Sequence, residues 1–60
     1  MELFRVKIDE ETVGDFTLAE LDLDPEVSDY LALDLQTCPI GYSAFDGGGA
    51  QPVFQYTRIA

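Results

Sequence analysis

An alternation of apolar and basic residues near the N-terminus is the clearest pattern in the sequence. Within residues 2–11, Phe4, Val6 and Ile8 are separated by single basic residues. A period of two places alternate side chains on one face of a strand, so this segment is predicted to be a β-strand with one face on the core. The polar stretch that follows, up to Gly14, predicts a turn.

Two helix-start signals follow in residues 16–36. Thr17-Leu-Ala-Glu20 matches the capping box, in which the threonine and glutamate side chains each accept a hydrogen bond from the other residue's backbone N–H. Asp24-Pro25-Glu26 supplies a second start, with Asp24 as the N-cap, proline at the first helical position and an acid beside the positive end of the helix dipole. The second signal predicts a helix over residues 25–36.

Apolar side chains recur every four residues along this predicted helix. Val27, Leu31 and Leu35 are expected to form a stripe on the core, with Ser28 and Ala32 beside it. The opposite side is expected to combine acidic and apolar side chains, namely Glu26, Asp29, Tyr30, Leu33 and Asp34. An alternative takes residues 21–23 and 31–35 as two strands, with residues 24–29 as the hairpin turn between them.

The C-terminal third of the chain is typical of a β-hairpin. Residues 40–45 and 52–59 are rich in strand-forming residues and flank the sequence Asp46-Gly47-Gly48-Gly49, which predicts a loose turn. Phe54 and Tyr56 would share one face. The predicted fold class is therefore α+β, a single domain with a three-stranded antiparallel sheet and one helix packed on its core face. A small all-β barrel is the alternative.

The distribution of charge adds an unusual feature to this small domain. The fifty residues between Lys7 and Arg58 hold eleven of the twelve acids and no basic residue, and the net charge is −9. Such a surplus opposes folding through self-repulsion. Because 47% of the residues are hydrophobic, with four phenylalanines and three tyrosines, a folded chain is expected rather than a disordered one.

The residue types present exclude most enzyme classes. Histidine is absent, which removes the usual general base near neutral pH and the commonest metal ligand. The triple glycine is not followed by Gly-Lys-Ser/Thr, so it predicts a hairpin tip and no phosphate site. Asp22, Asp24 and Glu26 have the spacing that opens a calcium loop, but Val27 and Leu33 stand where that loop needs glycine and glutamate. We therefore predict a protein without catalytic activity, cofactor or specific metal.

The single cysteine and the hydropathy of the chain bear on its location. Cys38 cannot form a disulfide within the chain, and it is expected to be a small buried residue in a reducing cytosol. The N-terminus lacks a charged region followed by an apolar run, and no apolar stretch approaches the roughly 20 residues that span a bilayer. A cytoplasmic, soluble monomer is predicted, one that an anionic membrane surface would repel.

A run of acids in the middle of the chain is the strongest functional signal. The candidate partner-binding residues are Glu20, Asp22, Asp24, Glu26, Asp29, Tyr30 and Asp34. Acids two apart on a strand, or three and four apart on a helix, lie about 5–7 Å from one another. DNA also carries closely spaced negative charge, so carboxylates can substitute for phosphates in a groove lined with lysine and arginine. In an alternative interpretation, the acids serve only solubility or adaptation to high salt.

In size, charge, absence of histidine and the acid run from Glu20 to Asp34, the chain resembles the small DNA mimics of phages and mobile elements. These are the anti-restriction and anti-CRISPR inhibitors. The resemblance implies a non-enzymatic inhibitor of a basic nucleic-acid-binding protein or complex in the bacterial host cytoplasm. The surface that it blocks could be the one with which a CRISPR effector recognises the motif beside the target DNA. Two alternatives are an acidic adaptor or immunity-type module that binds a basic protein away from any DNA site, and a calcium-responsive module.

Overall fold

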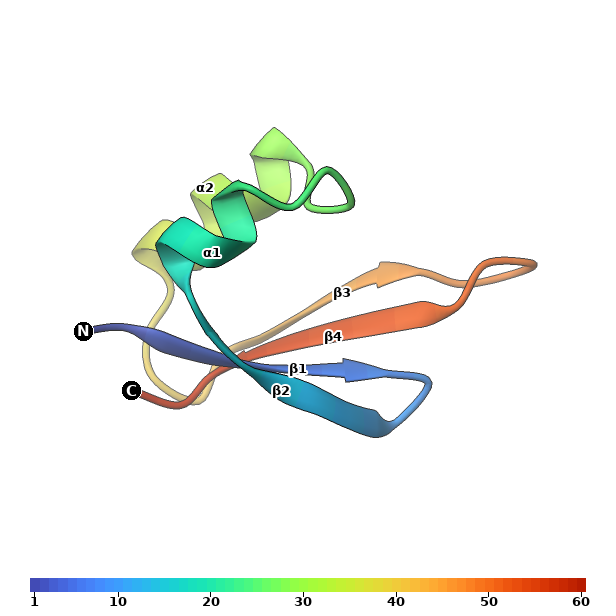
Figure 1. Cartoon of the computed structure of the whole chain (residues 1–60), viewed down its shortest axis with the longest axis horizontal. Coiled ribbons are helices and arrows are strands. Elements are labelled where there is room, and N and C mark those ends of the chain that lie inside the picture. Colours follow the sequence, from blue (N-terminus) through green and yellow to red (C-terminus); the bar gives the residue numbers. More distant parts are fainter.

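Four antiparallel strands form one open sheet, and two helices pack on one of its faces in the computed structural model, which describes all 60 residues (Figure 1). In chain order the elements are β1 (Leu3–Ile8), β2 (Glu11–Thr17), α1 (Leu18–Asp22), α2 (Asp29–Thr37), β3 (Ser43–Gly47) and β4 (Val53–Arg58). The strand order β2-β1-β4-β3 places the first and last strands side by side in the centre. The α+β class is thus confirmed, with one strand and one helix more than predicted.

The additional strand is β2, which begins within the segment up to Gly14 that was predicted to be a turn. β2 pairs antiparallel with β1 from Leu3 opposite Thr17 to Ile8 opposite Glu11, and the register shifts between Val6 and Lys7. The turn itself is only two residues long. Its signal was weak because Asp-Glu replaces the Asn-Gly or Asp-Gly that marks most two-residue hairpins.

This turn is held in an unfavourable backbone conformation by a contact with another strand. Asp9 and Glu10 have φ of 49° and 72°, the left-handed region that most residues avoid. The backbone N–H of Asp9 donates to the carbonyl oxygen of Val53 at 2.9 Å, and the Val53 N–H donates to Asp9 Oδ1 at 2.9 Å. Both hydrogen bonds join residues far apart in sequence. Tertiary contacts therefore stabilise a turn conformation that the backbone preferences of Asp9 and Glu10 disfavour.

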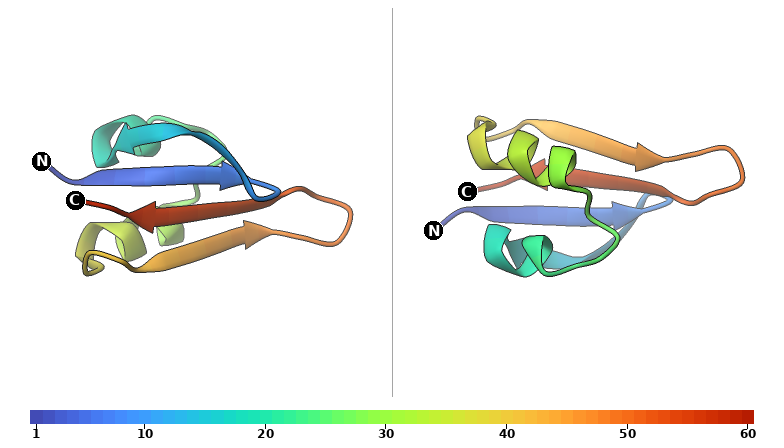
Figure 2. Two further views of the ribbon diagram at one scale, coloured as in Figure 1. Left: turned by 90° about the horizontal axis from the view of Figure 1, so that it is seen from below. Right: turned by 90° about the horizontal axis from the view of Figure 1, so that it is seen from above.

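The helical segment contains two helices where one was predicted. The capping box at Thr17 is confirmed and begins α1. The predicted start of the second helix at Asp24 is wrong, because α2 begins after Ser28, whose Oγ accepts from Leu31 N at 3.2 Å. Asp24 instead accepts from Glu26 N at 2.9 Å within the connection. Because the two helices lie side by side (Figure 2), the chain needs non-helical residues to reverse direction between them.

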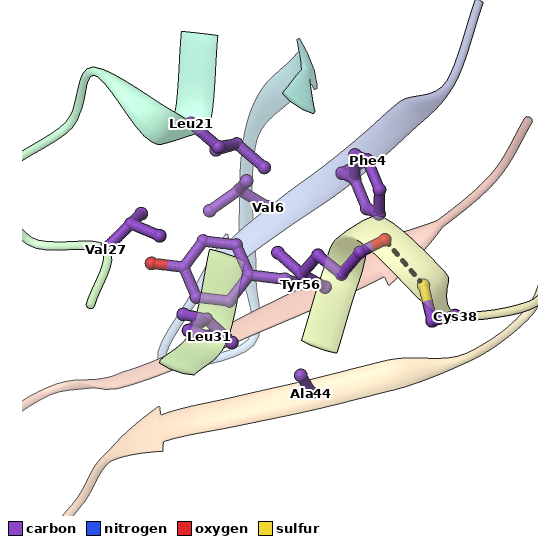
Figure 3. Packing of buried hydrophobic residues seen from close by; sticks show 9 residues of the cluster. Phe4, Val6, Leu21, Val27, Leu31, Cys38, Ala44 and Tyr56 are labelled. Carbon is purple, nitrogen blue, oxygen red and sulfur yellow. Dashed lines mark hydrogen bonds between the residues drawn. The ribbon is translucent and has the colours of Figure 1, made fainter. Parts of the chain in front are cut away.

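The core lies between the helices and the sheet. It consists of Phe4, Val6, Leu21, Val27, Leu31, Leu35, Cys38, Ala44 and Tyr56 (Figure 3). The predicted burial of Leu31 and Leu35 on one helix is confirmed, whereas Val27 is buried from the connection that precedes α2. The two-strand alternative for this segment is wrong, as is the all-β barrel. The predicted burial of the cysteine is also confirmed: its thiol donates to the Leu35 carbonyl oxygen at 3.3 Å, and burial raises its pKa.

The C-terminal hairpin is present with shorter strands than expected, and β3 includes Asp46 and Gly47, which were predicted to lie in the turn. β3 and β4 pair from Ser43 opposite Thr57 to Gly47 opposite Val53, and Phe54 and Tyr56 share the core face as predicted. Gly47 has φ of 91°, and a Cβ there would lie 2.1 Å from the carbonyl oxygen of Pro52. Only glycine fits this position, because the returning strand passes so close to it.

Truncation of the α2 stripe should unfold much of this small domain. Leu35 is fully buried, so Leu35→Ala is expected to lower the free energy of unfolding by about 2–5 kcal/mol. Leu33→Ala on the same helix is the matched control, since Leu33 is 61% exposed and its loss should cost less than about 0.5 kcal/mol. Urea denaturation followed by circular dichroism measures both. Equal losses would contradict the assigned helix orientation.

The strained turn yields a second prediction. Glu10→Gly removes the Cβ from a left-handed position and should raise the free energy of unfolding by about 0.5–1 kcal/mol. Glu11→Gly removes the same side chain from the first residue of β2 and should lower it by about 0.5–1 kcal/mol. Thermal denaturation of the two variants would disprove the turn conformation if the changes had the same sign.

Candidate functional site

The three basic residues all lie outside the helical layer. Arg5 and Lys7 alternate with the core residues of β1 and so occupy the sheet face that no helix covers. The Arg5 Nε donates to Asp15 Oδ1 at 3.0 Å on that face. The Arg58 guanidinium donates to the backbone carbonyl oxygens of Cys38 at 2.6 Å and Ala60 at 2.9 Å. Neither helix contains a basic residue, and the cation beside them is Arg58, at the end of the helical layer near Cys38.

The helical layer carries half of the acids of the protein. Residues 18–37 contain six of the twelve acids and no basic residue. We call the outward surface of α1, α2 and their connection the acidic helical face; its carboxylates are Glu20, Asp22, Asp24, Glu26, Asp29 and Asp34, all of which are exposed. Since the opposite sheet face holds two of the three bases, the negative potential is strongest on the helical side.

The structure distributes the predicted partner-binding residues over neighbouring parts of this face. Asp22 and Asp29 line a groove between the two helices. Glu20 and Asp24 lie at a recess between α1 and the sheet. Tyr30 and Asp34 line an open groove between α2 and β3, together with Asp46, and Glu26 lies on the connection. The seven residues thus lie on the helical layer and along its two borders with the sheet, without meeting at one point. No three carboxylate or thiol groups come close enough to hold a metal ion.

Hydrogen bonds fix three of these carboxylates in place, Asp24 through the contact with Glu26 N described above. Glu20 Oε1 accepts from the backbone N–H and the hydroxyl of Thr17 at 2.9 and 3.0 Å, and these contacts lower the pKa of the Glu20 carboxyl. Asp34 Oδ2 accepts from the Tyr42 hydroxyl at 2.6 Å, and this hydrogen bond raises the pKa of Tyr42. These three negative charges have defined positions, as recognition by a rigid cationic groove requires.

Large apolar side chains interrupt the acidic helical face. Tyr30 and Leu33, which the sequence placed on the outer side of the helix, are 88% and 61% exposed. Leu23, 85% exposed at the C-terminal end of α1, was missed because its environment depends on where that helix stops. Asp46 was also missed, since only the packing of β3 beside α2 brings it to this side. Exposed aromatic and aliphatic groups among charges are typical of protein interfaces.

Comparison with known proteins adds no assignment to this geometry. The chain matches no protein-family model, no curated protein and no solved structure. Neither helix is long and apolar enough to cross a bilayer. The functional argument therefore rests on the acidic helical face.

The hydrogen bond between Tyr42 and Asp34 should give the stability an alkaline dependence. Because the pKa of Tyr42 is raised above 10.0 in the folded protein, its stabilising contribution is present below that pH and is lost as the pH rises through the raised value. Tyr42→Phe should therefore be less stable than the wild type near neutral pH and equally stable at strongly alkaline pH. Urea denaturation across this range is the measurement. Tyr30→Phe, at a hydroxyl without a hydrogen bond, should not show this difference.

Proposed function

We propose that this protein is a non-enzymatic inhibitor that mimics DNA and blocks the nucleic-acid-binding surface of a host defence complex. Recognition of the target-flanking motif by a CRISPR effector is the specific surface we favour. The observation that carries the proposal is the acidic helical face, with six carboxylates and no base over twenty consecutive residues. An inhibitor of this kind would act in the bacterial cytoplasm, where such complexes meet DNA.

The electrostatics of the face support binding to a cationic groove. Lysine and arginine side chains that neutralise phosphates would meet carboxylates at comparable separations. The acidic helical face carries no basic residue that would compete with them for these carboxylates. Such complexes form through long-range attraction and weaken as salt shortens the range of the field. Tyr30 and Leu33 would add apolar contacts that DNA cannot make, and these could give the inhibitor an advantage over the nucleic acid.

The exposed apolar residues also support a second candidate, an adaptor or immunity-type module. Leu23, Tyr30 and Leu33 have no counterpart on a DNA backbone, and they would suit a basic protein surface that never binds DNA. The two functions differ in one measurable respect. An adaptor forms a complex while DNA stays bound to the partner, whereas a mimic and DNA exclude each other.

Competition for DNA tests the leading proposal. Purified CRISPR effector complexes and restriction enzymes are mixed with a fluorescent duplex that carries their recognition site, and the bound fraction is measured while the protein is added. Displacement of the duplex is expected from at least one target, with potency that falls by at least about tenfold between 50 and 200 mM salt. If a large excess displaced no duplex at low salt, the proposal would be wrong.

Two charge-reversal variants separate a specific face from net charge. Asp22→Lys with Glu26→Lys changes the acidic helical face at side chains that make no hydrogen bond, and it should reduce the potency at least about tenfold. Glu10→Lys with Glu11→Lys makes the same change in net charge at the β1–β2 turn, again at side chains without hydrogen bonds, and should leave the potency nearly unchanged. Equal losses in the two variants would show that net charge acts without a defined site.

A further inference from the structure

A recess in the core lies beneath the connection between the helices. The helices cover the part of the sheet near the chain termini, and the hairpin turns extend beyond them (Figure 2). At this boundary the sheet and α1 border a half-open recess of about 320 Å³. Seven of its nine lining residues are hydrophobic and come from β1, β2, α1 and β4, with Ile8, Phe16, Leu21 and Phe54 among them. An apolar group that entered this recess would contact apolar walls on its inner side.

One polar group in this wall has no partner within the protein. Tyr56 is only 2% exposed, yet its hydroxyl makes no hydrogen bond to any protein group. No side-chain oxygen or nitrogen is fully enclosed without a partner, so the hydroxyl is open to the recess that Tyr56 lines. It points away from Phe4 and Cys38 at the opposite end of the core (Figure 3). A hydroxyl that is open only to such a recess is free to form a hydrogen bond with a group that enters it.

The charges around the recess are all negative. Glu20 and Asp24 contribute to its lining. Burial raises the pKa of Tyr56, and the negative charges of Asp24, Asp46 and Glu26 raise it further. A ligand group beside this hydroxyl would experience a strongly negative potential, and a cation is favoured there.

We propose that the recess binds a primary ammonium group on an aliphatic stem, supplied by a lysine of the partner protein. The stem would pack on Ile8 and Phe54, while the ammonium would donate to the Tyr56 hydroxyl and to the Asp24 carboxylate. Lysine combines these two properties in one side chain, since its four methylenes are apolar and its head is a compact cation. The assignment to a lysine of the partner rests on the proposed function. The affinity of the recess for an alkylammonium group is independent of that function.

Titration with small probes tests the recess without partner or DNA. The ¹⁵N-labelled protein is titrated with n-hexylammonium, n-hexanol and hexanoate, and amide chemical shifts are followed by NMR. Saturable shifts around Ile8, Phe54 and Tyr56 are expected with hexylammonium. Hexanol, which lacks the ion pair, should bind about fivefold more weakly, and hexanoate should not saturate. Equal affinities for all three probes, or no saturable shift with hexylammonium, would overturn the proposal.

Matched variants locate the cation. Asp24→Asn keeps an oxygen that can accept from Glu26 N, and it should weaken hexylammonium binding about fivefold. Asp22→Asn makes the same change of charge outside the recess and should have less than a twofold effect. Tyr56→Phe keeps the buried ring and should weaken binding about fivefold through loss of one hydrogen bond. Equal effects of the two asparagine variants would overturn the proposed site.

A final arm tests the source of the amine. Nα-acetyl-lysine amide should shift the same amide resonances as hexylammonium, because its side chain offers the same head and stem. If only the free alkylammonium shifted them, the assignment to lysine would be overturned. If the titrations succeed and the DNA competition fails, the recess proposal stands and the inhibitor function is wrong. If the titrations fail and the competition succeeds, the inhibitor function stands and the recess proposal is wrong.

Discussion

The burial of only one face of the sheet is the constraint on which the rest of this structure depends. A chain of this length supplies a single core of nine buried residues, and both helices are needed to cover it. The helices consequently have a bare outer side, and the second face of the sheet stays open. Every charged residue must lie on one of these surfaces or at the edges, since the core contains no polar or charged side chain apart from the Tyr56 hydroxyl and the Cys38 thiol.

This constraint gives the protein two electrostatically different sides. Arg5 and Lys7 lie on the open sheet face because they alternate with the core residues of β1, and the acids of the helical layer point outward because the other helix positions are occupied by the stripe. Neither arrangement requires a charge to leave water, so the usual desolvation penalty is avoided. What remains is repulsion among the carboxylates, which a cationic partner would relieve on binding. The proposed inhibitor function uses that relief.

The helical layer also determines what lies beneath it. Because α1 is only five residues long and its connection to α2 loops outward, the helices do not reach the turn end of the sheet. The boundary exposes apolar walls and the Tyr56 hydroxyl to a space surrounded by acids. Charge on the surface and apolar contact in the recess would then act on the same partner. A purely acidic surface would attract many basic proteins, whereas an apolar recess beside it adds a steric and hydrogen-bonding requirement.

The sequence by itself determined the features that depend on local periodicity and capping. These are the strand from Leu3 to Ile8, the capping box at Thr17, the burial of Leu31 and Leu35 on α2, and the exposure of the acids. Tertiary structure alone decided the rest. The turn at Asp9 depends on hydrogen bonds to Val53, the start of α2 at Ser28 depends on the reversal between packed helices, and the recess depends on where four separate elements stop. Such contacts join residues distant in the chain, and a pattern read over a few neighbouring residues carries no information about them.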